Sequence, residues 1–109
     1  MDPLRVLVVD DTIVYRKIVS DVVSSIPGVT VVGSANNGRI AISRIQSLKP
    51  DLITLDVEMP EMNGLQVLEY IRKENLPTEA IMLSTLTVES RKMTIRALEL
   101  GAFDFIPKP

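Results

Sequence analysis

The sequence predicts an α/β fold in which a parallel sheet lies between two layers of helices. Short runs rich in Val, Ile and Leu alternate along the chain with segments whose apolar residues recur at helical spacing. Several of the short runs are almost continuously apolar, which is typical of strands buried on both faces. The connections are only a few residues long. This alternation predicts βαβ units with right-handed crossovers, and therefore a parallel sheet.

Five strands are predicted from runs of β-branched and bulky apolar residues. In chain order they are "LRVLVV" (4–9), "VTVVGSA" (29–35), "DLITL" (51–55), "EAIMLS" (79–84) and "FDFI" (103–106).

Four helices are predicted between these strands. Pro27 ends the first helix and Pro50 follows the second, because proline cannot continue a helix. Thr87 is a suitable N-cap for the fourth helix, and Gly101 suits the left-handed position after it. The helices and the apolar positions that mark them are 12–26 (Val14, Ile18, Val22), 38–48 (Ile40, Ala41, Ile45), 64–74 (Leu65, Leu68, Ile71) and 88–100 (Met93, Ala97, Leu100).

The composition of the 109-residue chain indicates one domain and excludes several functions. A net charge of −2, with no dense cluster of Lys and Arg, argues against nucleic-acid binding. Cys and His are both absent, which excludes disulfides, zinc sites built on those residues and His-based acid–base chemistry. No apolar stretch approaches the roughly 20 residues that span a bilayer, and the acidic start is unlike a secretory signal. We therefore expect a cytoplasmic protein without membrane insertion.

Polar side chains gather where the predicted strands end. In an open parallel sheet, ligands bind beyond the carboxyl ends of the strands, so these residues are the candidates for a site. They are Asp10 and Asp11 after the first strand, Asp56 after the third, Ser84 and Thr85 at the end of the fourth, and Lys108 after the fifth.

Taken singly, these residues have simpler explanations. Asp10 or Asp11 is equally expected as a helix cap, and Ser84 and Thr85 as turn hydroxyls. Together, however, three carboxylates in one pocket would repel one another and raise their pKa values unless a cation lies between them. Three acids, a lysine and no histidine predict Mg²⁺, which prefers oxygen ligands.

Magnesium and a fixed ammonium suit phosphoryl transfer, because both neutralise charge on the transferring group. Asp56, at the end of a central strand, is the candidate nucleophile that forms an aspartyl phosphate. Asp10 and Asp11 are expected to position the metal.

Over its whole length, the chain resembles the receiver domain of two-component response regulators. The resemblance rests on "VLVVDDT", "DLITLDVEMPEMNG", "LST", "ALELGAFDF" and the closing "KP", in this order and at suitable spacing. It implies a flavodoxin-like, doubly wound sheet with the strand order 2-1-3-4-5. It also implies that a histidine kinase transfers a phosphoryl group to Asp56.

By position, the resemblance implies how the metal and the phosphoryl group are held. Asp11 and Asp56 would bind Mg²⁺ directly, together with the backbone carbonyl of Glu58. Asp10 would support the metal from close by, and Lys108 would contact the phosphoryl oxygens.

The resemblance also implies a conformational switch. Ser84 would move to hydrogen-bond the phosphate, and Phe105 would be the aromatic residue whose rotamer reports the change. Phe105 stands where Tyr is frequent, so it has no hydroxyl to bond at the output surface. The surface formed by the fourth helix and fifth strand would then change its contacts with an attached domain.

A closer resemblance is to the regulatory domain of chemotaxis protein-glutamate methylesterases, through "TLDVEMPEMNGLQVLE" and "TIRALELGAFDFIPKP". In that family, a linker and a catalytic domain follow the receiver. Neither is in this sequence, so we expect no esterase activity here and only self-catalysed phosphorylation and dephosphorylation. The sequence stops where a fifth helix would follow, so residues 1–109 are expected to be a fragment of a longer chain. Without that helix, one side of the edge at the fifth strand is bare, and a dimer through this face is an open alternative.

Three alternatives compete with the receiver interpretation. A flavodoxin-like module could hold a small ligand's phosphate at the same edge, but "DDT" would repel a phosphate without a metal. An unphosphorylated docking module would not need the complete set of acids and Lys108. A magnesium-dependent phosphatase with an aspartyl nucleophile would need an acid two residues after Asp56, where Glu58 stands. However, Met59 and Pro60 follow in place of the expected pattern, and we expect no cap domain to bind a substrate.

Overall fold

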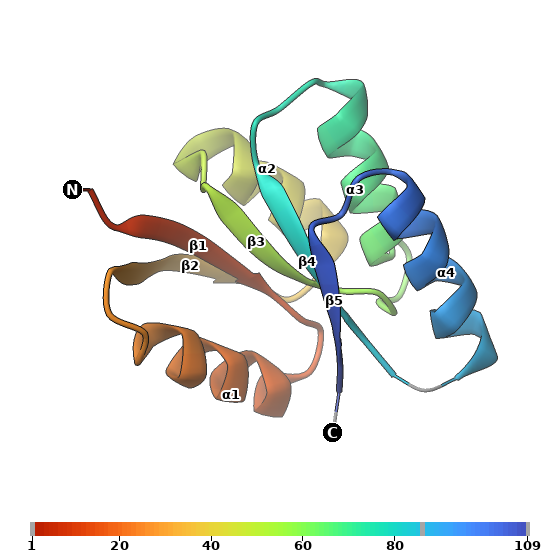
Figure 1. The fold of residues 1–109 in the computed structure, drawn as a ribbon, viewed down its shortest axis with the longest axis horizontal. Coiled ribbons are helices and arrows are strands. Elements are labelled where there is room, and N and C mark those ends of the chain that lie inside the picture. The colour runs from red at the N-terminus through yellow and green to blue at the C-terminus, as the bar shows by residue number, and fades with distance from the viewer. Residues whose placement is uncertain (1, 86, 109) are drawn as a thin grey trace.

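The strands form one sheet in the order β2-β1-β3-β4-β5, and all neighbouring pairs are parallel, which confirms the predicted fold (Figure 1). The structure is a computed structural model that describes residues 2–85 and 87–108. Its elements are β1 (Leu4–Val9), α1 (Ile13–Ser24), β2 (Val29–Ala35), α2 (Gly38–Leu48), β3 (Leu52–Asp56), α3 (Gly64–Lys73), β4 (Glu79–Ser84), α4 (Val88–Glu99) and β5 (Asp104–Pro107).

The observed elements differ from the predicted ranges only at their ends. Strand β3 is shifted by one residue, so Asp56 is its last residue instead of the residue that follows it. Helix α1 is the shortest relative to its prediction and ends at Ser24. Helix ends fray, and hydrophobic periodicity defines a buried face better than it defines a boundary.

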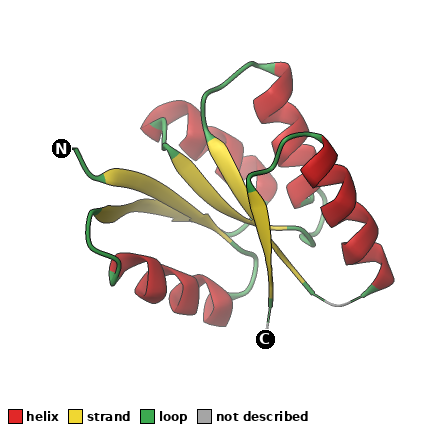
Figure 2. Cartoon of the chain, viewed as in Figure 1, coloured by secondary structure: helices red, strands yellow, loops and turns green. Residues whose placement is uncertain are grey.

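Helices cover the two faces of the sheet unequally (Figure 2). Helix α1 lies on one face, and α2, α3 and α4 lie side by side on the other. The main core fills the space beneath these three helices, where Leu7, Val9 and Leu55 of the strands meet Leu68 and Ile71 of α3. This packing holds the carboxyl ends of β1, β3 and β4 at one edge.

The apolar stripe of α1 is exposed, although its periodicity correctly indicates a helix. Val14 is 62% exposed, Ile18 47% and Val22 58%. In the described part of the chain, α1 is the one helix on its face of the sheet, so the outward side of the stripe has no neighbour. On the same face, Ile106 of the edge strand β5 is also exposed.

Among the described residues, no helix is both long enough and apolar enough to cross a membrane.

Candidate functional site

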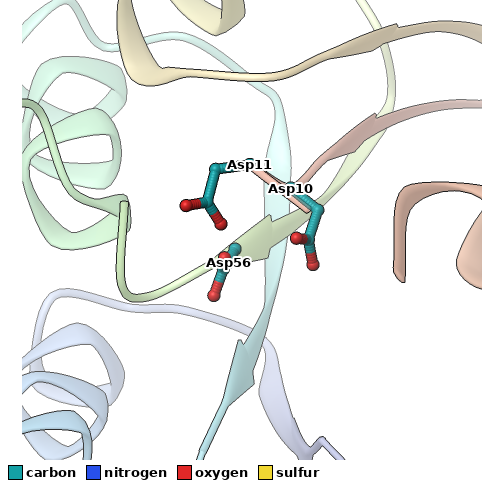
Figure 3. A group of neighbouring side chains, drawn as sticks. All are labelled: Asp10, Asp11 and Asp56. Carbon is teal, nitrogen blue, oxygen red and sulfur yellow. The ribbon is translucent and has the colours of Figure 1, made fainter. Parts of the chain in front are cut away.

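Three aspartates meet at the carboxyl edge of the sheet (Figure 3). Asp10 and Asp11 directly follow β1, and Asp56 is the last residue of β3. Strands β1 and β3 are neighbours in parallel register, with Val9 opposite Leu55, so the residues that come next lie side by side. One carboxylate oxygen from each aspartate lies within 4.8 Å of the other two.

Two of the three carboxylates are buried, while Asp11 is exposed. Asp10 is 0% and Asp56 2% exposed. The backbone N–H of Thr12 donates to Asp10 Oδ1 at 2.9 Å, and the N–H of Glu58 lies 3.3 Å from Asp56 Oδ1. Each buried carboxylate is therefore oriented by the backbone two residues beyond it.

Lys108 brings a positive charge to these carboxylates. Its backbone N–H donates to Ser84 O at 2.7 Å, which continues the pairing of β5 with β4 and fixes the start of the side chain. Its ammonium lies 2.9 Å from Asp10 Oδ2 and 3.1 Å from Asp56 Oδ2, and the side chain is only 8% exposed. The lysine thus forms two buried ion pairs.

The charges in this cluster do not balance. Burial is the largest cause that raises the pKa of Asp56 from its ordinary 3.8 to about 7; the neighbouring Asp11 carboxyl and the charge of Asp10 add to it, and Lys108 opposes it. Burial would lower the pKa of Lys108, but Asp10 and Asp56 outweigh burial and raise it. Lys108 is therefore charged at neutral pH, while its single charge does not compensate the three acids.

The chemistry of this donor set fits Mg²⁺. The ligands offered are carboxylate oxygens, which hard divalent cations prefer. Asp10 Oδ2 is buried and accepts no hydrogen bond of good geometry from the described residues, so the Lys108 ion pair alone compensates it. A divalent cation beside Asp11 and Asp56 would supply the missing positive charge.

The cluster opens into a polar pocket of about 490 Å³. The exposed Asp11 and the loop between β3 and α3 form its rim, so a small charged molecule can reach Asp56 from solvent. The pocket is lined by Asp11, Thr12, Tyr15, Asp56, Glu58, Met59, Pro60, Asn63, Thr85, Met93 and Lys108.

The loop that follows Asp56 is held close to it by α3. Gly64 N–H donates to Val57 O, and a Cβ on Gly64 would lie 2.2 Å from Asp56 O, so only glycine fits there. Asn63 and Gln66 form a capping box that fixes the first turn of α3.

Ser84 and Thr85 stand between two hollows at the end of β4. Thr85 lines both the acidic pocket and an apolar groove of about 400 Å³ between α4 and β5, whereas Ser84 lines the groove and is not among the residues that line the acidic pocket. Phe105, which is 43% exposed, lines the same groove. The structure therefore places Ser84 and Phe105 on the same groove beside α4.

Two contacts at the site were not predicted from the sequence. The ring of Tyr15 covers the ammonium of Lys108, with 4.5 Å from Nζ to the ring centroid. Glu58 Oε1 accepts a hydrogen bond of 3.0 Å from Thr87 Oγ1, at the start of α4. The first contact had no signal in the sequence, because Tyr15 and Lys108 lie near opposite ends of the chain. The second had none, because 29 residues separate its partners.

Comparison with known proteins agrees with the fold and the acidic edge. Residues 6–109 match the family model of the response regulator receiver domain. A protein-glutamate methylesterase/protein-glutamine glutaminase from Desulfotalea psychrophila is 61% identical over 109 residues, which cover 100% of this chain and 30% of that protein. One from Pyrococcus abyssi is 52% identical over 106 residues, or 97% of this chain and 28% of that protein. The chain thus spans about 30% of the length of these relatives.

Solved structures show the same likeness. The response regulator domain of Thermotoga maritima CheB has a TM-score of 0.88 and 48% identity, over 98% of this chain and 79% of that chain. A CheX-CheY-BeF3-Mg²⁺ complex from Borrelia burgdorferi has a TM-score of 0.86 and 29% identity, over 99% of this chain and 80% of that chain.

Proposed function

The chain belongs to the response regulator receiver domain family, and we propose from this that it accepts a phosphoryl group on Asp56 in a Mg²⁺-dependent reaction. The observation that carries the proposal is the surplus of negative charge around a buried, reachable carboxylate. Asp56 lies between Asp10 and Asp11, and Lys108 is the one ammonium described in contact with it. Such a site is suited to a cation and then to an anionic phosphoryl group.

In the proposed reaction, an Asp56 carboxylate oxygen attacks the phosphorus of a phosphodonor. A new O–P bond forms, and the bond between phosphorus and the donor's leaving group breaks, so the leaving group departs with its electron pair. Lys108 would contact the phosphoryl oxygens, while Asp11, Asp56 and the backbone carbonyl of Glu58 would hold Mg²⁺ and Asp10 would support it. The metal, when bound, supplies charge that stabilises the transferring group. Loss of the phosphoryl group to water would restore Asp56.

The surface made by α4 and β5 is the proposed output. Phosphorylation would favour a minor conformation in which Ser84 turns toward the phosphate. Ser84 and Phe105 line one groove, so a movement of the first changes the space available to the second. Phe105 would then report the state of Asp56 on the exposed surface.

A histidine kinase is the proposed phosphodonor, and an attached methylesterase domain the proposed target of the switch. The relatives of which this chain matches about 30% are named protein-glutamate methylesterase/protein-glutamine glutaminase, which supports an output domain of that activity. Because the phosphoryl supply of a kinase derives from ATP, we infer that the reaction takes place in the cytoplasm. The small-ligand and docking alternatives gain no support from the family match.

Intact-mass spectrometry after incubation with acetyl phosphate tests the proposal. We expect a gain of one phosphoryl group with Mg²⁺, little gain with a chelator, and no gain in Asp56→Asn. Asp51→Asn is the matched control, because Asp51 precedes the same strand at its opposite end and accepts a hydrogen bond from Arg5 N. If the folded wild-type chain bound magnesium yet gained no mass, the chain would be a docking or small-ligand module.

The proposed switch is tested separately with beryllofluoride, a phosphoryl analogue. Amide resonances of α4 and β5 should shift when beryllofluoride and Mg²⁺ are added. Unchanged resonances over 88–106, alongside shifts near Asp56, would show that phosphorylation does not reach the α4–β5 surface.

A further inference from the structure

Tyr15 provides a third side to the enclosure of the Lys108 ammonium. Two sides are formed by the buried carboxylates of Asp10 and Asp56, at 2.9 and 3.1 Å. The third is the ring of Tyr15, whose centroid lies 4.5 Å from Nζ. This distance is inside the range of about 6 Å over which the negative face of an aromatic ring attracts a cation.

The ring and the ammonium come from different elements. Tyr15 lies in the first turn of α1, and its half-buried side chain lines the acidic pocket. Lys108 follows the short edge strand β5, which pairs with β4 alone in the described sheet. Its four-carbon stem is flexible and has several rotamers of similar energy. A helix-borne ring is therefore placed to restrict an ammonium that reaches the site on a long, flexible side chain.

Without the ring, the ammonium of Lys108 could form an ion pair with another acid. Asp11 is exposed, lines the same pocket and has a carboxylate oxygen within 4.8 Å of Asp10 and Asp56 oxygens. A lysine that paired with Asp11 would leave Asp56 and would compete with a metal for the Asp11 oxygens. The ring packs against Nζ, 4.5 Å from its centroid, and so favours the pairing with Asp10 and Asp56.

We propose that Tyr15 is a positioning residue that holds Lys108 in place for phosphoryl transfer by packing its ring against the ammonium. This inference rests on the proposed phosphorylation of Asp56 for its kinetic consequence, but not for the contact itself. It assigns the role to the aromatic face, so the ring is required and the hydroxyl is not.

The contact is tested first in the metal-free protein by NMR. The ε-methylene protons of Lys108 should be shifted upfield by the ring current of Tyr15. The shift should persist in Tyr15→Phe and disappear in Tyr15→Leu. Tyr70→Leu is the matched control: Tyr70 lies in α3, its hydroxyl contacts Gln46 and it does not line the pocket, so the Lys108 shift should remain.

The consequence is tested by the rate of phosphorylation from acetyl phosphate at saturating Mg²⁺. We expect Tyr15→Leu to slow it about three- to tenfold, in keeping with the strength of a cation–π contact, and Tyr15→Phe to stay within about twofold of wild type. Tyr15→Met serves the same purpose should Tyr15→Leu fail to fold. An equal loss in Tyr15→Phe and Tyr15→Leu would overturn the inference, since the hydroxyl would then carry the effect.

The two proposals fail in different ways. A native rate in a variant that has lost the Lys108 ring-current shift would overturn the positioning role and leave phosphorylation intact. If wild type accepted no phosphoryl group, the proposed function would fail. The ring-current comparison would then decide alone whether Tyr15 holds Lys108, because it is made without metal or phosphate.

Discussion

Lys108 Nζ lies 3.1 Å from Asp56 Oδ2, yet this buried ion pair does not keep the pKa of Asp56 low. Burial and the two neighbouring aspartates outweigh the lysine and raise that pKa to about 7. The site therefore stores electrostatic repulsion in the metal-free chain. The same cluster of acids that suits the site to a cation is therefore expected to lower the free energy of unfolding of the metal-free chain.

The first prediction is that the metal-free chain loses stability as the pH rises from about 4 to about 7. Asp56 has an ordinary pKa of 3.8 and a raised value of about 7 in the folded protein, so the folded state binds the extra proton between these values. That contribution is complete below pH 4 and lost as the pH passes 7. Lys108, whose pKa is raised, stays charged throughout. Urea unfolding in EDTA should show a loss on the order of 1–4 kcal/mol.

Asp56→Asn isolates this effect from the other acids that titrate in the same range. The variant should be more stable than wild type at pH 8, and the difference should shrink toward pH 4. Parallel curves for the two proteins would mean that Asp56 titrates normally in the folded chain.

The second prediction is that Mg²⁺ stabilises the wild-type chain at neutral pH. A ligand that binds only the folded state, at about 100 times its Kd, adds about 2.7 kcal/mol to the free energy of unfolding. We expect Asp11→Asn to remove most of this gain, because it deletes a proposed ligand at the exposed rim. Thermal unfolding across a Mg²⁺ titration measures it. Glu69→Gln, an exposed acid of α3, should respond as wild type does; equal gains in both variants would place the metal elsewhere.

The α/β class was predictable from the alternation of strand and helix segments along the chain, and the strand order was implied by the resemblance to receiver domains. Apolar runs and helical stripes recur with short connections, and each strand delivers its last polar residue to the same edge. Asp10, Asp11 and Asp56 could therefore be brought together before any geometry was known, and the structure places their carboxylates within 4.8 Å of one another.

What could not be predicted depends on side-chain direction and on missing neighbours. The apolar stripe of α1 indicates a buried face, but its residues are exposed. Burial requires a second element beside the stripe, and periodicity cannot show whether one is present. Ser84 and Thr85 are adjacent hydroxyls, and the sequence does not show that Thr85 lines the acidic pocket and Ser84 does not. The contacts of Tyr15 with Lys108 and of Thr87 with Glu58 join distant segments and have no sequence period.

The third prediction concerns Gly64, which packs against the backbone of Asp56. Gly64→Ala would place a Cβ 2.2 Å from Asp56 O, a backbone atom that cannot move without displacing the end of β3. We expect a loss of roughly 2–4 kcal/mol in urea unfolding together with weaker Mg²⁺ binding. Gly28→Ala is the comparison: its φ of +82° is strained for alanine, but nothing lies within 4 Å of the new Cβ. It should cost about 1 kcal/mol and leave Mg²⁺ binding unchanged. Similar losses and similar metal binding in both variants would contradict the crowding at Gly64.

The fourth prediction is that Glu58 and Thr87 couple the loop between β3 and α3 to helix α4. Thr87 Oγ1 accepts a hydrogen bond from Ser90 N at 3.1 Å and donates one to Glu58 Oε1 at 3.0 Å, so one hydroxyl caps the helix and ties it to the loop after Asp56. Thr87→Val should cost about 0.5–2 kcal/mol through the lost cap, and Thr87→Ser should restore most of it. A double-mutant cycle with Glu58→Ala, followed by urea unfolding, should give a coupling energy of about 0.5–1 kcal/mol. Additive losses would mean that the two residues act independently.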